Sequence, residues 1–556
     1  MANLNFKGKS AVWNHHLSVP YRVLEKDKKL SSKGKNEDEN LIIEADNLWA
    51  LKSLLPKYQG KIKCIYIDPP YNTGNEGWVY SDNVNSPIIK EWLREGPVGT
   101  DDLTRHDKWL CMMTPRLKLL RELLSDDGVI FVSINDNEVA NLRNLMDEIF
   151  IENNFVANLI WMNKEGGGSS DSAHFKVKHE YILCFAKDKT QLNINQSIVE
   201  SDVDYTFKDK YEKERGKYKM IKLNSFSIQY SASLDYPISS PDKTKIFPSE
   251  NGKKGCWRWS KKKLEWGLEN DFIEFRKDKN DNWIVYTKQY FKVDNENKPI
   301  VRSLPPLAII DKFSSTMASK QLEELMGGAK IFEYSKPYPL IQYLAKLSTD
   351  ENDLILDSFA GSGTTAQAVL ELNEEDRKNG KEANRKFILV QLPEETKKDS
   401  PARKAGFKFV HEITRERVAR VIKKIAKESG QKTETGFSYL KLGPKIDTEE
   451  LLIGKLPSYK ELAKYVFYLA TGKILENEKI IDEKKYFVGK NASESIYLIY
   501  EKDREKLKNL ALDLDFVEKT KNDKNKKIVY APACFLDDEI SEANNISFVN
   551  IPYGLQ

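Results

Sequence analysis

The residues of this 556-residue chain that most clearly suggest chemistry are Asp68-Pro69-Pro70-Tyr71, which directly follow the apolar run 64–67. An apolar run ended by prolines predicts a buried strand that leads into a tight loop. The two prolines fix φ and remove backbone donors, so the loop holds its groups rigidly. Asp68 and the Pro69 carbonyl can each accept an N–H, and Tyr71 can stack on a ring. The cluster therefore favours a site for a planar base with an exocyclic amine, although Asp-Pro-Pro alone could simply end a strand.

A second cluster of chemically informative residues lies almost three hundred positions downstream. The run 354–356 predicts a buried strand, and a helical pattern covers 366–372. Between them stands Asp357-Ser358-Phe359-Ala360-Gly361-Ser362-Gly363-Thr364-Thr365. Glycines let the backbone approach a ligand closely, and a strand–turn–helix of this kind is typical of nucleotide pockets. No Gly-Lys-Ser/Thr follows and a third glycine is missing, which argues against a Walker loop and against a pyrophosphate ligand. A plain strand–turn–helix without a ligand is the alternative.

Together the two clusters resemble the motifs of DNA amino-methyltransferases that use S-adenosylmethionine. The catalytic motif precedes the cofactor motif, which is the order of the permuted β group. The strongest likeness is to the modification subunits of type III restriction–modification systems, and it covers about residues 40–185 and 330–425. Further matching stretches are 45–48, 72–77, 127–134, Lys336-Pro337 and 387–394.

The resemblance implies a role for each matching residue. The catalytic residues would be Asp68, Pro69, Pro70 and Tyr71, acting on adenine N6 of a base flipped out of duplex DNA. The S-adenosylmethionine pocket would be formed by Asp46, Asp357, Phe359, Ala360, Gly361, Gly363 and Thr364. The ribose hydroxyls of the cofactor usually meet an acid one strand further on. Gln391 occupies that place here and Glu394 lies just beyond it, so both are candidates.

The elements that must position these residues alternate between strand and helix. The helix over 107–124 carries Leu110, Met113, Leu117 and Leu120 on one stripe. Buried strands are expected over 129–134, 181–186 and 387–392, and a basic helix over 412–427. This alternation predicts a doubly wound, mostly parallel, Rossmann-like α/β sheet, in which ligands bind beyond the carboxyl ends of the strands. In the fold implied by the resemblance, the strands before Asp68 and Asp357 are neighbours.

The chain length predicts several domains. We expect a polar, loosely packed N-terminal arm over 1–40 and the two halves of the methyltransferase core over 41–189 and 311–444. An inserted target-recognition domain would cover 190–310, and a small C-terminal α/β domain 445–556. The Gly/Ser stretch 166–172 is either a linker or a mobile loop near the DNA.

Positive charge is concentrated in the middle of the chain. Residues 208–263 hold fifteen Lys or Arg and six Asp or Glu, a local charge of +9 in a chain whose net charge is +4. Basic side chains mixed with aromatics suit phosphate contact and stacking, although a solvated lysine-rich surface has the same composition. Arg258, between Trp257 and Trp259, is either a base reader or part of a structural cation–π sandwich. The lysines predicted to meet phosphates are Lys253, Lys254, Lys261, Lys262 and Lys263.

Composition narrows the class of protein. Hydrophobic residues make up 40% of the chain and aromatic residues 11%, which indicates a globular protein. No run approaches twenty apolar residues and the first residues have no apolar signal segment, so we expect no membrane span and no export. The five cysteines are scattered without metal-binding spacing, which predicts a reducing cytoplasm and no metal site. The resemblance implies that this cytoplasm is bacterial.

Three alternatives to an adenine-N6 DNA methyltransferase remain open. A cytosine-N4 enzyme would share the chemistry, although aspartate at the first motif position favours adenine. A nuclease–methyltransferase fusion is disfavoured, because only about forty residues precede the core. A catalytically inactive DNA-recognition subunit is the third. The resemblance also implies double-stranded DNA as substrate, a homodimer, and a separate restriction (helicase–nuclease) subunit as partner.

Overall fold

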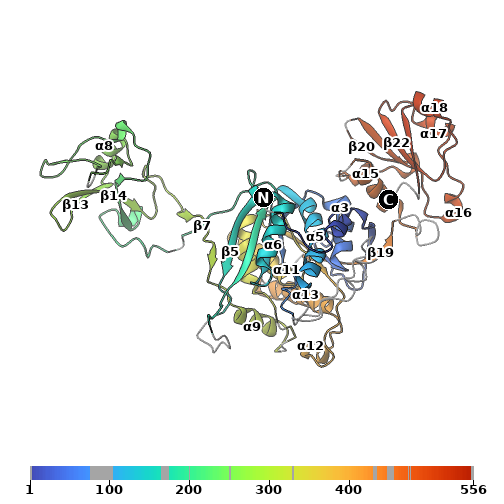
Figure 1. Cartoon of the computed structure of the whole chain (residues 1–556), viewed down its shortest axis with the longest axis horizontal. Coiled ribbons are helices and arrows are strands. Elements are labelled where there is room, and N and C mark those ends of the chain that lie inside the picture. Colours follow the sequence, from blue (N-terminus) through green and yellow to red (C-terminus); the bar gives the residue numbers. More distant parts are fainter. Residues whose placement is uncertain are drawn as a thin grey trace. The chain divides into compact units, whose positions relative to one another are not determined.

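The protein is described here from a computed structural model, which divides into two compact units, Met1–Ile194 with Leu307–Gln556, and Asn195–Pro306 (Figure 1). The structure describes residues 3–74, 104–164, 174–199, 201–249, 252–328, 331–332, 334–429, 435–446, 456–471, 473, 475, 477–491 and 493–551. The predicted stretches 75–77 and 166–172 therefore lie outside the described residues.

A large mixed sheet forms the centre of the first unit. Its described strands are, in spatial order, β1 (Arg22–Lys26), β19 (Ser438–Lys445), β2 (Leu41–Glu44), β18 (Lys386–Gln391), β17 (Leu354–Asp357), β3 (Ile62–Ile67), β4 (Leu124–Ile134), β6 (Glu180–Ala186), β5 (Phe155–Trp161) and β16 (Ile309–Ile310). The six strands from β19 to β4 are parallel to one another. β6 is antiparallel to both its neighbours and β1 is antiparallel to β19. The mostly parallel sheet confirms the predicted fold class.

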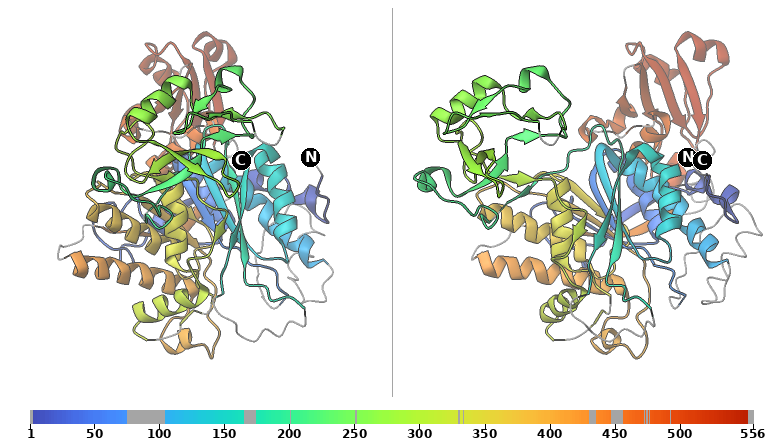
Figure 2. Two further views of the ribbon diagram at one scale, coloured as in Figure 1. Left: turned by 90° about the vertical axis from the view of Figure 1, so that its left-hand side faces the viewer. Right: turned by 60° about the vertical axis from the view of Figure 1, so that its left-hand side comes forward.

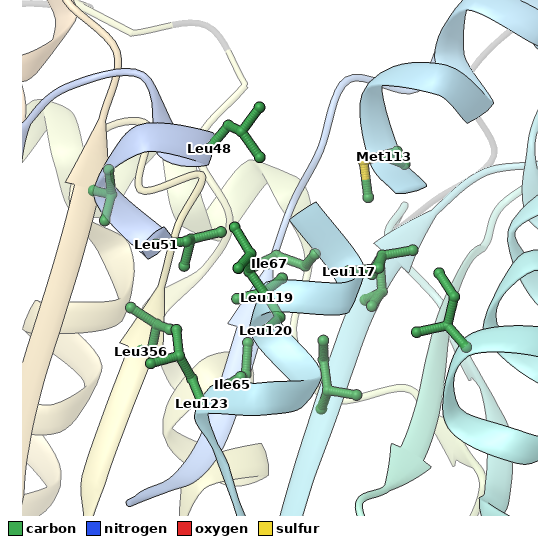
Figure 3. Close-up of a cluster of buried hydrophobic side chains, with 14 of the residues drawn as sticks. Leu48, Leu51, Ile65, Ile67, Met113, Leu117, Leu119, Leu120, Leu123 and Leu356 are labelled. Atoms are coloured by element: carbon green, nitrogen blue, oxygen red, sulfur yellow. The ribbon is translucent and has the colours of Figure 1, made fainter. Parts of the chain in front are cut away.

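Helices cover both faces of this sheet, as Figure 2 shows. On one face lie α3 (Asn47–Tyr58), α5 (Arg105–Leu123) and α6 (Val139–Met146), and on the other α10 (Tyr338–Ser348), α11 (Thr364–Lys378) and α13 (Val410–Ser429). Side chains of β3 alternate between the two cores, because successive residues of a strand point to opposite faces. Ile65 and Ile67 pack under α3 and α5, as Figure 3 shows, whereas Cys64 and Tyr66 face the other side.

The predicted stripe on α5 is buried, but so is most of the rest of this helix. Leu117 and Leu120 belong to the same buried core as Ile65 and Ile67 of β3 (Figure 3), and Trp109 and Arg116 are also fully enclosed. The reason is the N-terminal segment, which we expected to be loosely packed. Its short helices α1 (Lys9–Val12) and α2 (His15–Ser18) cover α5, and its strand β1 joins the large sheet. The segment is polar on average, but a few of its apolar side chains are buried, and the overall composition did not reveal them.

The unit Asn195–Pro306 has a small core of its own. Strands β8 (Tyr218–Lys222), β14 (Trp283–Tyr290) and β13 (Ile273–Lys277) form an antiparallel sheet, and β9 (Asn224–Ser225) pairs with β12 (Cys256–Trp257). Helix α8 (Lys261–Glu269) packs beside them. Leu223, Trp257, Phe272 and Tyr290 are buried between these elements.

The C-terminal residues form a second, four-stranded sheet. Its strands are β20 (Phe487–Lys490), β21 (Glu494–Leu498), β22 (Lys526–Ala531) and β23 (Ile546–Asn550), and the last three are parallel. Helix α15 (Tyr459–Thr471) packs on this sheet, and its Tyr465 ring stacks on Tyr21, with 4.5 Å between ring centroids. Among the described helices, none has the length and apolar character needed to cross a membrane.

Candidate functional site

The Asp68 loop lies at the carboxyl end of β3, as predicted, and neighbouring side chains hold it. The fully buried Trp109 of α5 donates a hydrogen bond from Nε1 to the Pro70 carbonyl over 2.7 Å. Asn72, at φ 56°, donates to the buried carboxylate of Glu138, which also contacts His106 at 2.6 Å. The loop is thus fixed by α5 and by the residue before α6.

The glycine turn that follows β17 is held at both ends. The Asp357 carboxylate accepts hydrogen bonds from the Phe359 N–H at 3.0 Å and the Thr365 hydroxyl at 2.5 Å. Gly361 and Gly363 adopt φ 51° and 85°, a region that favours glycine, and Gly363 caps the start of α11. The Gly361 N–H donates to the Gln391 side chain at 2.6 Å. The backbone needed for a close approach to a ligand is therefore already formed.

The two clusters meet because their strands are neighbours. β3 and β17 pair in parallel, with Cys64 opposite Ile355 and Ile65 opposite Leu356, so that Asp68 and Asp357 leave the same edge of the sheet. Burial raises the pKa of Asp357 to about 7, and the charge of Asp68 acts in the same direction. This confirms the strand arrangement that the resemblance implied.

Of the other predicted cofactor residues, some hold the backbone of the site in place and others could contact the cofactor directly. Asp46 accepts the Leu48 N–H as the N-cap of α3 and pairs with Arg116 at 3.1 Å. Its neighbour Asn47 donates to the Ser358 carbonyl at 3.0 Å, so this segment touches the glycine turn. Gln391 supports Gly361, whereas Glu394 is exposed just beyond the strand.

The turn fits the methionine part of S-adenosylmethionine. The Ser358 hydroxyl is buried and has no hydrogen-bond partner among the described residues, so it is available to a ligand. A Cβ at Gly361 would already lie in van der Waals contact with the Phe332 ring, at 3.6 Å, so a larger side chain there would crowd the turn. The carboxylate of Asp357 suits a ligand that carries a sulfonium and an ammonium.

Three residues complete the acceptor side of the site. The Lys336 ammonium donates to both Asp68 oxygens, at 2.9 and 2.8 Å, and lies 3.6 Å from Glu180. Glu180 in turn accepts from the Tyr71 hydroxyl at 2.9 Å and from the Asn163 amide at 2.7 Å. Lys336 belonged to a matching motif, but nothing in the sequence indicated that it would pair with Asp68. Glu180 directly precedes the predicted strand 181–186, and Asn163 had no signal in the sequence.

Opposing effects set the pKa of Asp68. Burial raises the pKa of this carboxyl, while the charge and hydrogen bonds of Lys336 lower it. The net effect is a pKa of Asp68 above its ordinary value. Burial likewise tends to lower the pKa of Lys336, but Asp68 and Glu180 outweigh that effect and raise it, so the ammonium stays charged.

The predicted DNA-contacting residues are only partly on the surface. Trp257 and Trp259 are 2% and 6% exposed and belong to the core of the inserted unit, where the Trp257 Nε1 donates to the Tyr236 carbonyl at 2.7 Å. Direct contact of these two rings with DNA is therefore a wrong prediction. Arg258 between them is exposed. The cation over the Trp259 ring is Lys263, at 5.1 Å from the ring centroid, which replaces the predicted sandwich with Arg258.

Known proteins similar to this chain are DNA methylases and methyltransferases. Residues 62–400 match the family described as DNA methylase. The chain is 36% identical over 478 residues to the Mod subunit of the type III restriction–modification enzyme EcoPI of Escherichia phage P1, covering 79% of this chain and 71% of that protein. It is 32% identical to the StyLTI Mod subunit of Salmonella typhimurium, covering 72% of this chain and 60% of that protein. The solved PvuII DNA methyltransferase (cytosine-N4-specific) is 13% identical with a TM-score of 0.33, and the match covers 70% of this chain and 93% of that one.

Proposed function

The chain belongs to the DNA methylase family and is an S-adenosylmethionine-dependent DNA methyltransferase, and from that premise we propose that it methylates adenine N6 as the modification subunit of a type III restriction–modification system. The observation that carries the proposal is the shared edge of β3 and β17, where an acceptor motif and a cofactor turn meet. The intact Asp68, Tyr71 and Asp357 favour an active enzyme over an inactive recognition subunit.

The acceptor chemistry follows from the Asp68 loop. An amine attached to an aromatic ring is a poor nucleophile, because its lone pair is delocalised into the ring. Asp68 and the Pro69 carbonyl would accept its two N–H groups and favour a pyramidal nitrogen, and Tyr71 would stack on the flipped base. When bound, S-adenosylmethionine supplies the methyl group: the amine lone pair forms the N–C bond, the S–C electron pair stays on sulfur, and one amine proton leaves to solvent.

The modified nucleoside tests this proposal. DNA amplified in vitro, and hence unmethylated, is incubated with the protein and S-adenosylmethionine, digested, and analysed by mass spectrometry. We expect N6-methyladenine. N4-methylcytosine would replace the adenine assignment with the cytosine one, and no methylated nucleoside would contradict an active enzyme.

We further propose that the inserted unit binds DNA through lysines around α8. Lys261 and Lys262 are exposed in the first turn of this helix, and that turn holds no acidic residue. Lys253 and Lys254 are exposed nearby in sequence. Positive side chains at a helix N-terminus are unfavourable on their own, and a bound phosphate would relieve this. Arg258 is the remaining candidate for a base contact.

Replacing Lys253, Lys254, Lys261 and Lys262 together by glutamine should weaken binding to every DNA sequence. The slope of log affinity against log salt should become shallower by about 0.9 for each phosphate that is no longer neutralised. Fluorescence anisotropy at several salt concentrations measures this. The matched control changes Lys277 and Lys298 of the same unit, which already pair with Asp281 and Glu296. Equal slopes for both variants would place DNA binding elsewhere.

Two partners are proposed from the family alone. The protein would act as a homodimer, for which light scattering should give twice the chain mass of 64.1 kDa at micromolar concentration. A mass of one chain together with full activity would contradict it. A separate restriction subunit would bind this protein, as the names of the related type III enzymes suggest, and the pair would act on DNA in the cytoplasm.

A further inference from the structure

A single ammonium group occupies both places that the acceptor site offers to a base. Lys336 contacts the two Asp68 oxygens at 2.9 and 2.8 Å, which uses the acceptor assigned to the amine. The same Nζ lies 5.0 Å from the centroid of the Tyr71 ring, which is the stacking surface. An ammonium offers three N–H donors, so it satisfies Asp68 much as an exocyclic amine would. The base and this side chain therefore compete for the same groups.

A second acid lies within reach of the same ammonium. Glu180 Oε2 is 3.6 Å from Lys336 Nζ, slightly beyond a direct hydrogen bond. Glu180 is held in place by the Tyr71 hydroxyl and the Asn163 amide. The Lys336 side chain is only 12% exposed and also lies 5.8 Å from the Trp161 ring. A small side-chain movement would transfer Lys336 from Asp68 to Glu180 without exposing its charge to solvent.

We propose that Lys336 fills the amine position of the acceptor site in the free protein and moves to Glu180 when the target base enters. This inference rests on the proposed methyl transfer. Lys336 and Glu180 are then positioning residues that act through Asp68. In the free protein Lys336 favours the ionised form of the buried Asp68. In the complex Glu180 holds the positive charge away from the amine, whose nitrogen becomes positive as the methyl group arrives.

The charged and titratable groups facing Asp68 come from every neighbouring element. Tyr66 is on its own strand and Tyr71 on its own loop, Glu180 is on β6, Asp357 on β17, and Lys336 precedes α10. Lys336 is the cation of this set. Burial and Glu180 oppose ionisation of Asp68, so removal of the ammonium shifts the titration of Asp68 to higher pH.

The first experiment compares rate–pH profiles of the full-length protein and Lys336→Met on unmethylated DNA at saturating S-adenosylmethionine. The profile of kcat/KM reports groups of the free enzyme, and that of kcat reports groups of the complex. We expect the acidic limb of kcat/KM to move up by about one pH unit or more in Lys336→Met, whereas the limb of kcat stays in place. Equal movement of both limbs would show that Lys336 remains on Asp68 in the complex. No movement would show that it does not act on Asp68 at all.

The second experiment tests whether Glu180 accepts the Lys336 ammonium when the base enters. In Glu180→Gln the side chain keeps its size but cannot neutralise the ammonium, so Lys336 stays on Asp68 and kcat/KM at pH 8.5 falls about tenfold. Adding Lys336→Met to this variant should restore kcat/KM to within about threefold of Lys336→Met alone. A double variant no better than Glu180→Gln would mean that Glu180 only supports Tyr71, which overturns the proposed transfer.

A mostly enclosed lysine on β3 provides the matched control. Lys63 pairs with Asp127 at 2.5 Å, and its side chain is 13% exposed, close to the value for Lys336. Lys63→Met should leave both pH profiles unchanged, and thermal melting of each variant checks the fold. Absence of methyl transfer by the unmodified protein would contradict the proposed function. Normal transfer with profiles of Lys336→Met identical to those of Lys63→Met would overturn this inference alone.

Discussion

Asp68→Ala is expected to abolish methyl transfer while leaving the affinity for S-adenosylmethionine within about threefold of the original. Asp68 acts on the acceptor amine, whereas the cofactor turn is held by Asp357, Thr365 and Gln391 without it. Loss of a preorganised hydrogen-bond acceptor at the reacting nitrogen should lower the rate by at least about 10² to 10³. Single-turnover transfer of a radiolabelled methyl group and calorimetric binding measure the two effects.

The control for this variant is Asp127→Ala, which removes the acid of the other lysine–carboxylate pair near the same strand. It should change neither rate nor cofactor affinity. Turnover of Asp68→Ala near that of Asp127→Ala would contradict the assigned chemistry. A large loss of cofactor affinity would instead assign Asp68 to the cofactor side of the site.

Gly361→Val should lower the affinity for S-adenosylmethionine by about tenfold or more. At φ 51° a β-branched residue is strained by roughly 1–3 kcal/mol. Its Cβ would also lie 3.6 Å from the Phe332 ring, so its methyl groups would crowd the turn. The Gly361 N–H and carbonyl are bound by Gln391 and Thr414, both at 2.6 Å, so the strain would disturb the turn itself. Isothermal calorimetry on the folded variant measures the effect.

The matched control is Gly380, where a valine would be strained in the same way but lies outside the glycine turn. It lies just past α11 at φ 80°, and a Cβ there would meet no atom within 4 Å. Gly380→Val should therefore lower the melting temperature much as Gly361→Val does, yet bind the cofactor normally. Unchanged binding in folded Gly361→Val would remove the turn from the cofactor site.

Much of the core could be predicted because its signals are local. A parallel strand buried on both faces is a continuous apolar run, and prolines or glycines mark its end. The strands before Asp68 and Asp357 and the helix α11 were found in this way. A prediction that rested on composition alone was wrong. The polar N-terminal segment was expected to be loosely packed, but it packs on α5 and adds β1 to the sheet.

The sequence by itself determined which residues end the two central strands, and hence the motifs of the acceptor loop and the cofactor turn. Only the tertiary structure decided what surrounds them. Lys336 reaches Asp68 across 268 positions of the chain, and Glu180 comes from the antiparallel strand β6. The tertiary structure also buries Trp257 and Trp259, away from solvent. The physical reason is that local pattern records burial and backbone preference, whereas pairing of charges and choice of face depend on strands brought together from distant parts of the chain.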